Sequence, residues 1–158
     1  MSDRSTDAPL GATKYVVLWF RIFFGAHLLY SALRYYLTTA SVGPPPDSLG
    51  GQFIAAITAT GIYHIVKTVE LFTGAMIFFN LFVPLALVIE FPISIVILIL
   101  NFFVVASGRQ LFSGPLEVVL NGLLLIFYGR YYMPMFNLFA SPKPLWQAKR
   151  EDMRMPRT

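Results

Sequence analysis

The amino-acid sequence predicts an all-α fold, a transmembrane antiparallel four-helix bundle with a short interfacial helix in its first, extracytoplasmic loop. The 158-residue chain is 56% hydrophobic and 13% charged, and that charged fraction is about half the usual one. Four apolar segments are long enough to cross a bilayer, because roughly 20 helical residues span the hydrocarbon core. The run over 71–106 has no loop-like break, yet as one helix it would be about 54 Å long, so it must fold back on itself.

Four membrane-spanning helices are expected, at 14–37, 61–81, 84–106 and 115–133. Asn80 and Pro84 supply the turn between the second and third helices, because proline is favoured in the first helical position. Gly114-Pro115 should open the fourth helix in the same way, and Pro134 should end it. The polar N-terminus lacks the basic region of a signal peptide, so the first span is expected to be retained.

The long connection over 38–60 contains a stiff turn at Pro44-Pro45-Pro46. After it, Phe53, Ile54 and Ile57 fall on one face of a short helix that could lie in the membrane interface. A simple loop and a lid over a pocket are both compatible with this pattern.

Basic residues predict the orientation. Five of the twelve lie in 143–157, whereas the long loop has none. By the positive-inside rule, residues 1–13 form a polar cytoplasmic N-terminus and residues 134–158 a basic cytoplasmic tail. The expected location is the bacterial inner membrane, with several passes. The net charge of +4 is explained by orientation and by contact with anionic lipid, so no nucleic-acid partner is predicted.

Ionisable residues inside the expected spans are the leading site candidates, because a charge at the bilayer centre costs about 2.5–3.5 kcal/mol unless it pairs or reaches water. Counting residues from the helix ends places Arg21 and Glu90 at matching depths of about 10 and 9 Å from the cytoplasmic side. We predict that they form a structural ion pair that fixes helix packing.

The outer half carries a graded polar column from three helices: His27, Arg34, His64, Lys67, Glu70 and Glu117. The count places His27 and Glu70 near the midplane, Lys67 about 9 Å deep, and the other three within about 5 Å of the outer surface. Such a column could relay protons, or form the polar end of a pocket for a quinone or a lipid headgroup. It could equally be a satisfied packing network with side chains that snorkel to the interface.

Several chemistries are excluded. The chain has no cysteine, so it cannot form disulfides, thiolate metal sites or iron–sulfur clusters alone. Haem ligation by His27 and His64 fails because their depths differ by about 10 Å. No metal site, no intrinsic cofactor and no catalytic residue set is predicted.

The sequence resembles the DoxX-like family of four-span membrane proteins over about 15–130. The residues that carry the resemblance are Arg21, Gly25, Gly61 and above all Glu70-Leu71-Phe72-Thr73-Gly74, which is similar to the family's Glu-Leu-x-Gly-Gly signature. Thr73 stands where the family usually has glycine. The resemblance implies the four-span fold, and some relatives are subunits of quinone-linked respiratory or thiosulfate-oxidising complexes.

The leading expectation is therefore an auxiliary, non-catalytic transmembrane subunit of a redox-linked complex. Its 15 Phe are too many for so small a chain to bury, so their rings must face lipid or other membrane subunits. The alternative is a module that binds quinone or lipid between the first two helices, with Lys67 and Glu70 as polar contacts. A small transporter is a third reading, made weaker by the lack of an inverted repeat.

Overall fold

The structure, a computed structural model, describes residues 10–38 and 44–136. The described residues are helical and contain no β-strand, which confirms the predicted all-α class. In chain order the elements are α1 (Leu10–Leu37), α2 (Leu49–Ala59), α3 (Ile62–Phe78), α4 (Val83–Ile99), the π-helical continuation η1 (Leu100–Val105), α5 (Gly108–Phe127), and the 3-10 turns η2 (Gly129–Tyr131) and η3 (Met133–Phe136).

Three stretches within these helices are long and apolar enough to cross a membrane: Thr13–Leu37, Val83–Val105 and Gly108–Phe127. A fourth crossing is obtained if α2 and α3 count together, although they are bent by 86° relative to each other. Helix α3 alone has 17 residues, at the lower limit for a span. This composition fits a multi-pass membrane protein.

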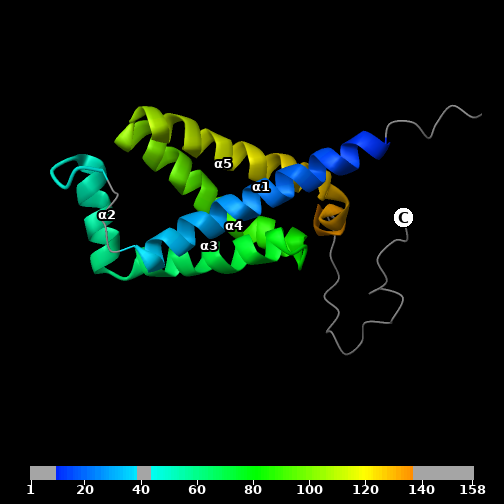
Figure 1. The fold of residues 1–158 in the computed structure, drawn as a ribbon, viewed down its shortest axis with the longest axis horizontal. Helices are drawn as coiled ribbons and strands as arrows, with labels where there is room; N and C mark the ends of the chain where they lie inside the picture. Colours follow the sequence, from blue (N-terminus) through cyan, green and yellow to red (C-terminus); the bar gives the residue numbers. More distant parts are fainter. Residues whose placement is uncertain (1–9, 39–43, 137–158) are drawn as a thin grey trace, which may run out of the picture.

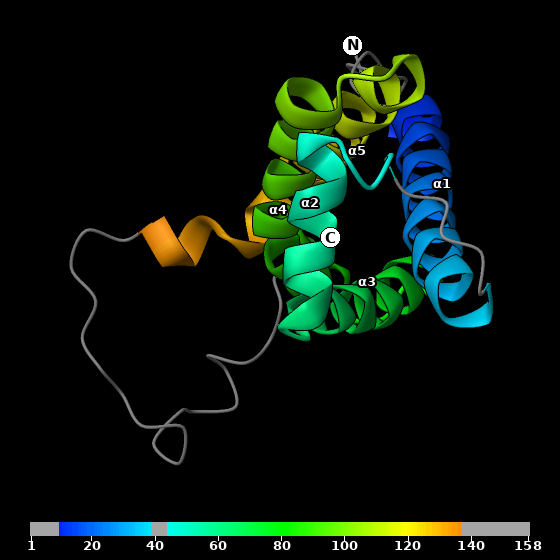
Figure 2. The ribbon, with the colours of Figure 1, turned by 90° about the vertical axis from the view of Figure 1, so that its left-hand side faces the viewer.

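The long helices α1, α3, α4 and α5 lie beside one another, and α2 is set across one end of them (Figure 1). Seen from that end, α2 runs in front of α4 and reaches the start of α3 (Figure 2). We call this end, where α1 finishes and α3 begins, the α2 end. We call the other, where α3 and α5 finish, the terminal end. Sequential helices run in opposite directions between these two ends.

Turn residues explain how the chain changes direction. Gly61 has a φ of 77°, a left-handed conformation that glycine adopts at no steric cost, and it sits at the bend between α2 and α3. Asn80 and Phe82 also have positive φ, and Pro84 lies in the first turn of α4. The turn predicted at Asn80 and Pro84 is therefore present.

Helix α5 differs from expectation at both ends. It begins at Gly108, seven residues before the predicted start at 115, and it ends at Phe127. Pro115 was taken as a helix opener but lies inside the helix. Membrane helices tolerate such a proline because neighbouring groups compensate for the missing backbone hydrogen bond. The connection expected over 107–114, between the third and fourth spans, is consequently reduced to Ala106 and Ser107.

The short helix expected around Phe53, Ile54 and Ile57 exists as α2. Its N-cap is Ser48, whose hydroxyl accepts a hydrogen bond from the N–H of Gly51 at 3.1 Å. A Cβ on Gly51 would lie 2.0 Å from the Pro45 carbonyl oxygen, so only glycine fits where the proline turn crosses the helix.

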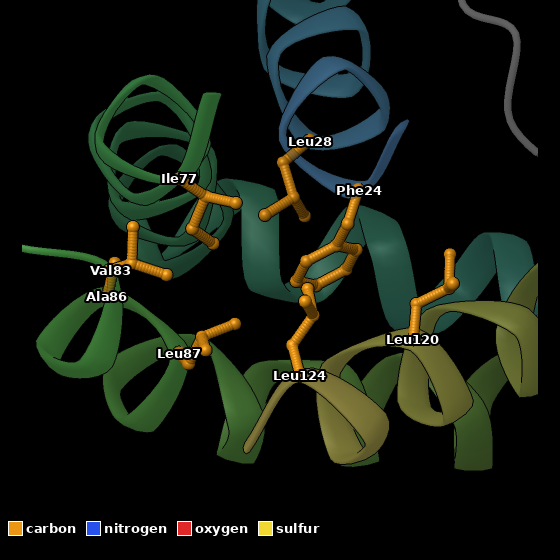
Figure 3. Close-up of a cluster of buried hydrophobic side chains, with 8 residues drawn as sticks. All are labelled: Phe24, Leu28, Ile77, Val83, Ala86, Leu87, Leu120 and Leu124. Carbon is orange, nitrogen blue, oxygen red and sulfur yellow. The ribbon is translucent and has the colours of Figure 1, made fainter. Parts of the chain in front are cut away.

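Large apolar side chains from all four long helices meet toward the terminal end (Figure 3). Phe24 and Leu28 of α1 project between Ile77 of α3 and Leu124 of α5. The members of this apolar cluster are Phe24, Leu28, Ile77, Val83, Ala86, Leu87, Leu120 and Leu124.

Glycines bring α1 and α3 into close contact. A Cβ on Gly25 would lie 2.7 Å from the backbone nitrogen of Phe78, and one on Gly74 would lie 2.9 Å from Leu28 Cβ. These contacts set the register of the two helices, with Gly25 level with Phe78 and Leu28 level with Gly74.

Candidate functional site: a buried polar cluster

Seven polar or charged residues of the described chain are buried, and they come from three helices. Helix α3 contributes Lys67, Glu70 and Thr73, α4 contributes Glu90 and Ser94, and α5 contributes Glu117 and Asn121. We call this set the buried polar cluster. Buried polar groups need hydrogen-bond partners inside the protein. The partners of each member therefore decide which groups of the cluster are free for chemistry.

Lys67 and Glu70 form a closed ion pair. The Lys67 ammonium donates to both carboxylate oxygens of Glu70, at 2.8 and 2.7 Å, and to the Ser31 hydroxyl at 2.8 Å. It also lies 5.4 Å from the centre of the Tyr63 ring. The predicted contact between Lys67 and Glu70 is present because residues three apart share a helix face. All three donor hydrogens of the ammonium have acceptors.

His27 and Glu117 approach each other, although the sequence placed them at different depths. His27 Nε2 lies 3.6 Å from Glu117 Oε2, and the His27 side chain is 31% exposed. The depth expected for Glu117, within about 5 Å of the outer surface, assumed that its helix begins at 115, and this start is wrong. Because α5 begins at Gly108, Glu117 lies about 13 Å along the helix, level with His27. The second oxygen of Glu117, Oε1, is buried without a hydrogen-bond partner in the part of the chain that the structure describes.

The predicted ion pair between Arg21 and Glu90 does not form in the described part of the chain. Glu90 instead has its Oε2 2.5 Å from the Thr73 hydroxyl. Thr73 neighbours Gly74, which is level with Leu28. Arg21 lies seven residues before Leu28, or about 10 Å further toward the terminal end. Counting depth from separate helix ends missed this offset.

Ser94 and Asn121 link α4 to α5. The Asn121 amide donates to the Ser94 hydroxyl at 3.3 Å. With the amide turned over, it donates to the Leu87 carbonyl at 3.3 Å and accepts from the Phe91 N–H at 3.2 Å. Both orientations of the amide therefore give Asn121 its partners on α4 and not on its own helix. Sequence reasoning missed Ser94 and gave Thr73 no site role. The available signal was a small polar residue inside an otherwise apolar helix.

The two outermost members of the predicted column stand apart from the cluster. The exposed His64 ring packs against the rings of Tyr35 and Tyr36, with centres 6.1 and 5.3 Å away. The Tyr36 hydroxyl lies 2.7 Å from the Thr68 hydroxyl. Arg34 is half-buried and forms no ion pair with any residue that the structure describes.

An apolar hollow of about 520 Å³ lies away from this cluster, at the terminal end. Its walls come from α4, the end of α5 and the turns that follow, and they include Val88, Leu125, Tyr132 and Phe136. The Tyr132 hydroxyl donates to the Pro84 carbonyl at 2.7 Å. Burial raises the pKa of Tyr132 to about 12, so this donor keeps its proton at neutral pH.

The chemistry available to the cluster follows from its charges. It holds three carboxyl groups, and their only basic neighbours in the described chain are Lys67 and His27. No group of three or more His, Asp or Glu side chains in the described ranges is arranged to hold a metal ion. The groups present can therefore pair with one another or hold protons.

Comparison with models of protein families, with curated protein sequences and with solved structures found no match. The resemblance to DoxX-like proteins stays a prediction based on the residues quoted for it.

Proposed function

We propose that this chain is an auxiliary, non-catalytic subunit of a bacterial inner-membrane complex that is linked to redox chemistry. The observation that carries this proposal is the closed state of the Lys67–Glu70 pair. The Lys67 ammonium donates to both carboxylate oxygens of Glu70 and to the Ser31 hydroxyl, so neither charged group is left over for a substrate. The surrounding α1–α3 contact is too close for a bound ring, because Gly74 meets Leu28 there.

The proposed membrane arrangement is an antiparallel four-helix bundle with α2 in the outer interface and both termini in the cytoplasm. Two features support it. The connection that contains α2 has no Lys or Arg, whereas the exposed Arg130 lies just beyond α5 at the terminal end. Basic residues favour the cytoplasmic side, so the α2 end should face outward.

The face of α1 near its start is the best candidate for a contact with a partner subunit. Tyr15, Trp19 and Phe23 are exposed and recur every fourth residue, which places them on one stripe. The rings of Trp19 and Phe23 stack with centres 5.2 Å apart. Rigid aromatic side chains are enriched at the energetic centres of protein interfaces.

Photo-crosslinking in the native membrane tests this proposal. A photoreactive amino acid at Trp19, which is 59% exposed, should trap a specific membrane protein in the cells that make this chain. The same amino acid at Phe72, an exposed aromatic position on α3 (65%), is the matched control and should trap mainly lipid. A protein that purifies alone and monomeric, with no protein trapped from either position, would contradict the role of subunit.

A quinone- or lipid-binding role has a separate supporting observation, the apolar hollow at the terminal end. A volume of about 520 Å³ falls within the range of small-molecule sites. Its apolar walls suit an isoprenoid or acyl chain. Mass spectrometry of the purified protein should then detect a stoichiometric quinone or lipid, and Leu125→Trp should displace it by filling the hollow. Equal occupancy in the variant would remove this candidate.

A further inference from the structure

Glu90 differs from the other two buried carboxyl groups because it lies within ion-pair distance of no basic side chain that the structure describes. Glu70 is bonded to Lys67, and Glu117 faces His27 at 3.6 Å. Glu90 is completely buried, and among the described residues its only hydrogen-bond partner is the Thr73 hydroxyl. Its second oxygen, Oε1, has no hydrogen-bond partner within residues 10–38 and 44–136. An ionised carboxylate in such a place would be strongly disfavoured, because nothing compensates its lost hydration.

The hydrogen bonds around Thr73 indicate which form of Glu90 fits. The Thr73 hydroxyl has one hydrogen to give, and three acceptors lie within reach: Glu90 Oε2 at 2.5 Å, the Val69 carbonyl at 2.9 Å and, less closely, the Glu70 carbonyl at 3.4 Å. If Glu90 is protonated, its hydroxyl donates to Thr73, and Thr73 donates to Val69. Both bonds are then made. If Glu90 is ionised, the Thr73 hydroxyl must donate to Glu90, and the Val69 carbonyl keeps only its backbone hydrogen bond within α3.

We propose that Glu90 is a proton-binding site that exchanges with water through the α2 end of the bundle. Loading adds one proton from water to the Glu90 carboxylate, and no electron moves. The charged groups that interact with it are Lys67 and Glu70 on α3 and Glu117 on α5, and α1 contributes His27 through Glu117. This inference does not depend on the proposed role as a subunit. Only the side of the membrane from which the proton enters depends on the proposed topology.

Polar groups occupy the side of Glu90 that faces the α2 end. On α3 they recur every three or four residues, from the exposed His64 through Lys67 and Glu70 to Thr73. The Ser94 hydroxyl and the Asn121 amide lie one turn beyond Glu90 in the same direction. Intramembrane chains of this kind are typical of proton pathways.

The opposite side of Glu90 is closed by the apolar cluster. Ala86 and Leu87, one turn earlier on α4, are fully buried, and Ile77, one turn after Thr73 on α3, is fully buried as well. Phe24 and Leu28 fill the space between these helices and α5 (Figure 3). A site that water reaches from one side alone can bind and release a proton, but it does not conduct protons across the membrane.

Infrared spectroscopy of the purified full-length protein in lipid tests the site. At neutral pH the wild-type protein should show the carbonyl band of a protonated carboxylic acid, and Glu90→Gln should remove it. Thr73→Val should shift the same band by removing its hydrogen-bond partner. Glutamine has the shape of a neutral glutamic acid, so E90Q should fold as stably as wild type. A missing band in the wild-type protein, a band unaffected by E90Q, or a strongly destabilised E90Q would each overturn the assignment.

Deuterium exchange of the same band tests the route. The double variant Lys67→Met with Glu70→Gln removes both charges of the ion pair, so that neither partner stays behind as an unpaired buried charge. Exchange at Glu90 should then slow by about a hundredfold, the lower end of what a positioned proton-transfer group contributes. Ile77→Val changes the apolar side of the same helix and should leave the rate unchanged. Equal rates in all three proteins, or slowing by Ile77→Val alone, would overturn the one-sided route.

Discussion

Removing one member of the Lys67–Glu70 pair should destabilise the protein far more than removing both. Lys67→Met leaves the Glu70 carboxylate, which is 1% exposed, without the two short hydrogen bonds that it now accepts from the ammonium. An uncompensated buried charge of this kind costs about 3–5 kcal/mol. In Lys67→Met with Glu70→Leu no charge remains, and the loss should be no more than about 1–2 kcal/mol, set by the packing of two altered side chains.

Equilibrium unfolding of the four proteins in mixed micelles measures this prediction as a double-mutant cycle. The expected coupling between the two sites is several kcal/mol, well above the scatter of about 0.3–0.5 kcal/mol for independent sites. The defect of Lys67→Met should also shrink in acid, because protonating Glu70 removes the uncompensated charge. Glu117→Gln offers a comparison, since its longer contact with the partly exposed His27 should make it less costly to remove.

A double variant as unstable as the sum of its singles would refute this reasoning. It would mean that the two side chains stabilise the bundle through separate packing contacts. Equal defects at neutral and acid pH would lead to the same conclusion.

Three further predictions test the contact between α1 and α3, the hydrogen bond from Tyr132 to the start of α4, and the membrane topology. Gly25→Ala should destabilise by about 1–2 kcal/mol despite the better helix propensity of alanine, because its Cβ would lie 2.7 Å from the backbone of α3; Gly122→Ala, with nothing within 4 Å of the new Cβ, should be neutral or slightly stabilising in the same assay. Tyr132→Phe should cost about 1 kcal/mol by removing a hydrogen bond. Wild type should also lose stability between about pH 10 and 12, where unfolded tyrosine ionises and the folded one does not, and the variant should lack that component of its pH profile. A cysteine near Asp47 should react with impermeant thiol reagents in intact cells, and one beyond Lys149 only in broken cells; the reverse pattern would overturn the orientation.

The sequence was sufficient to predict the helical class and most helix positions, because hydrophobic length and turn residues are local signals. The Asn80–Pro84 turn was predicted on that basis, and the structure contains it. The start of α5 was not predicted. Pro115 gives the same local signal whether it opens a membrane helix or lies inside one, and only the packing of Gly114 against Asn101 separates the two cases.

The predicted site shows the same division. The Lys67–Glu70 contact follows from spacing within one helix, so it could be predicted. Contacts between helices depend on their relative register, and each residue of error in a helix start moves a side chain by about 1.5 Å. An error of seven residues in α5 was enough to separate Glu117 from His27, which the structure brings together. The close approach at Gly25 likewise decides where Arg21 lies, and spacing along one helix cannot show it.

The arrangement of polar groups by depth connects these results. Short buried side chains such as Thr73 and Ser94 cannot reach water, so their hydroxyl groups need hydrogen-bond partners within the protein. Both have a partner on a neighbouring helix. Those partners lie at and beyond Glu90 toward the α2 end, whereas toward the terminal end the helices are joined by apolar contacts and by Gly25. The apolar contacts that hold the helices together therefore lie toward the terminal end, and the polar contacts lie toward the α2 end. A change in the protonation of Glu90 would act on the polar half and leave the apolar half packed, so an exposed α1 stripe near the terminal end could hold a partner while the proton site exchanges.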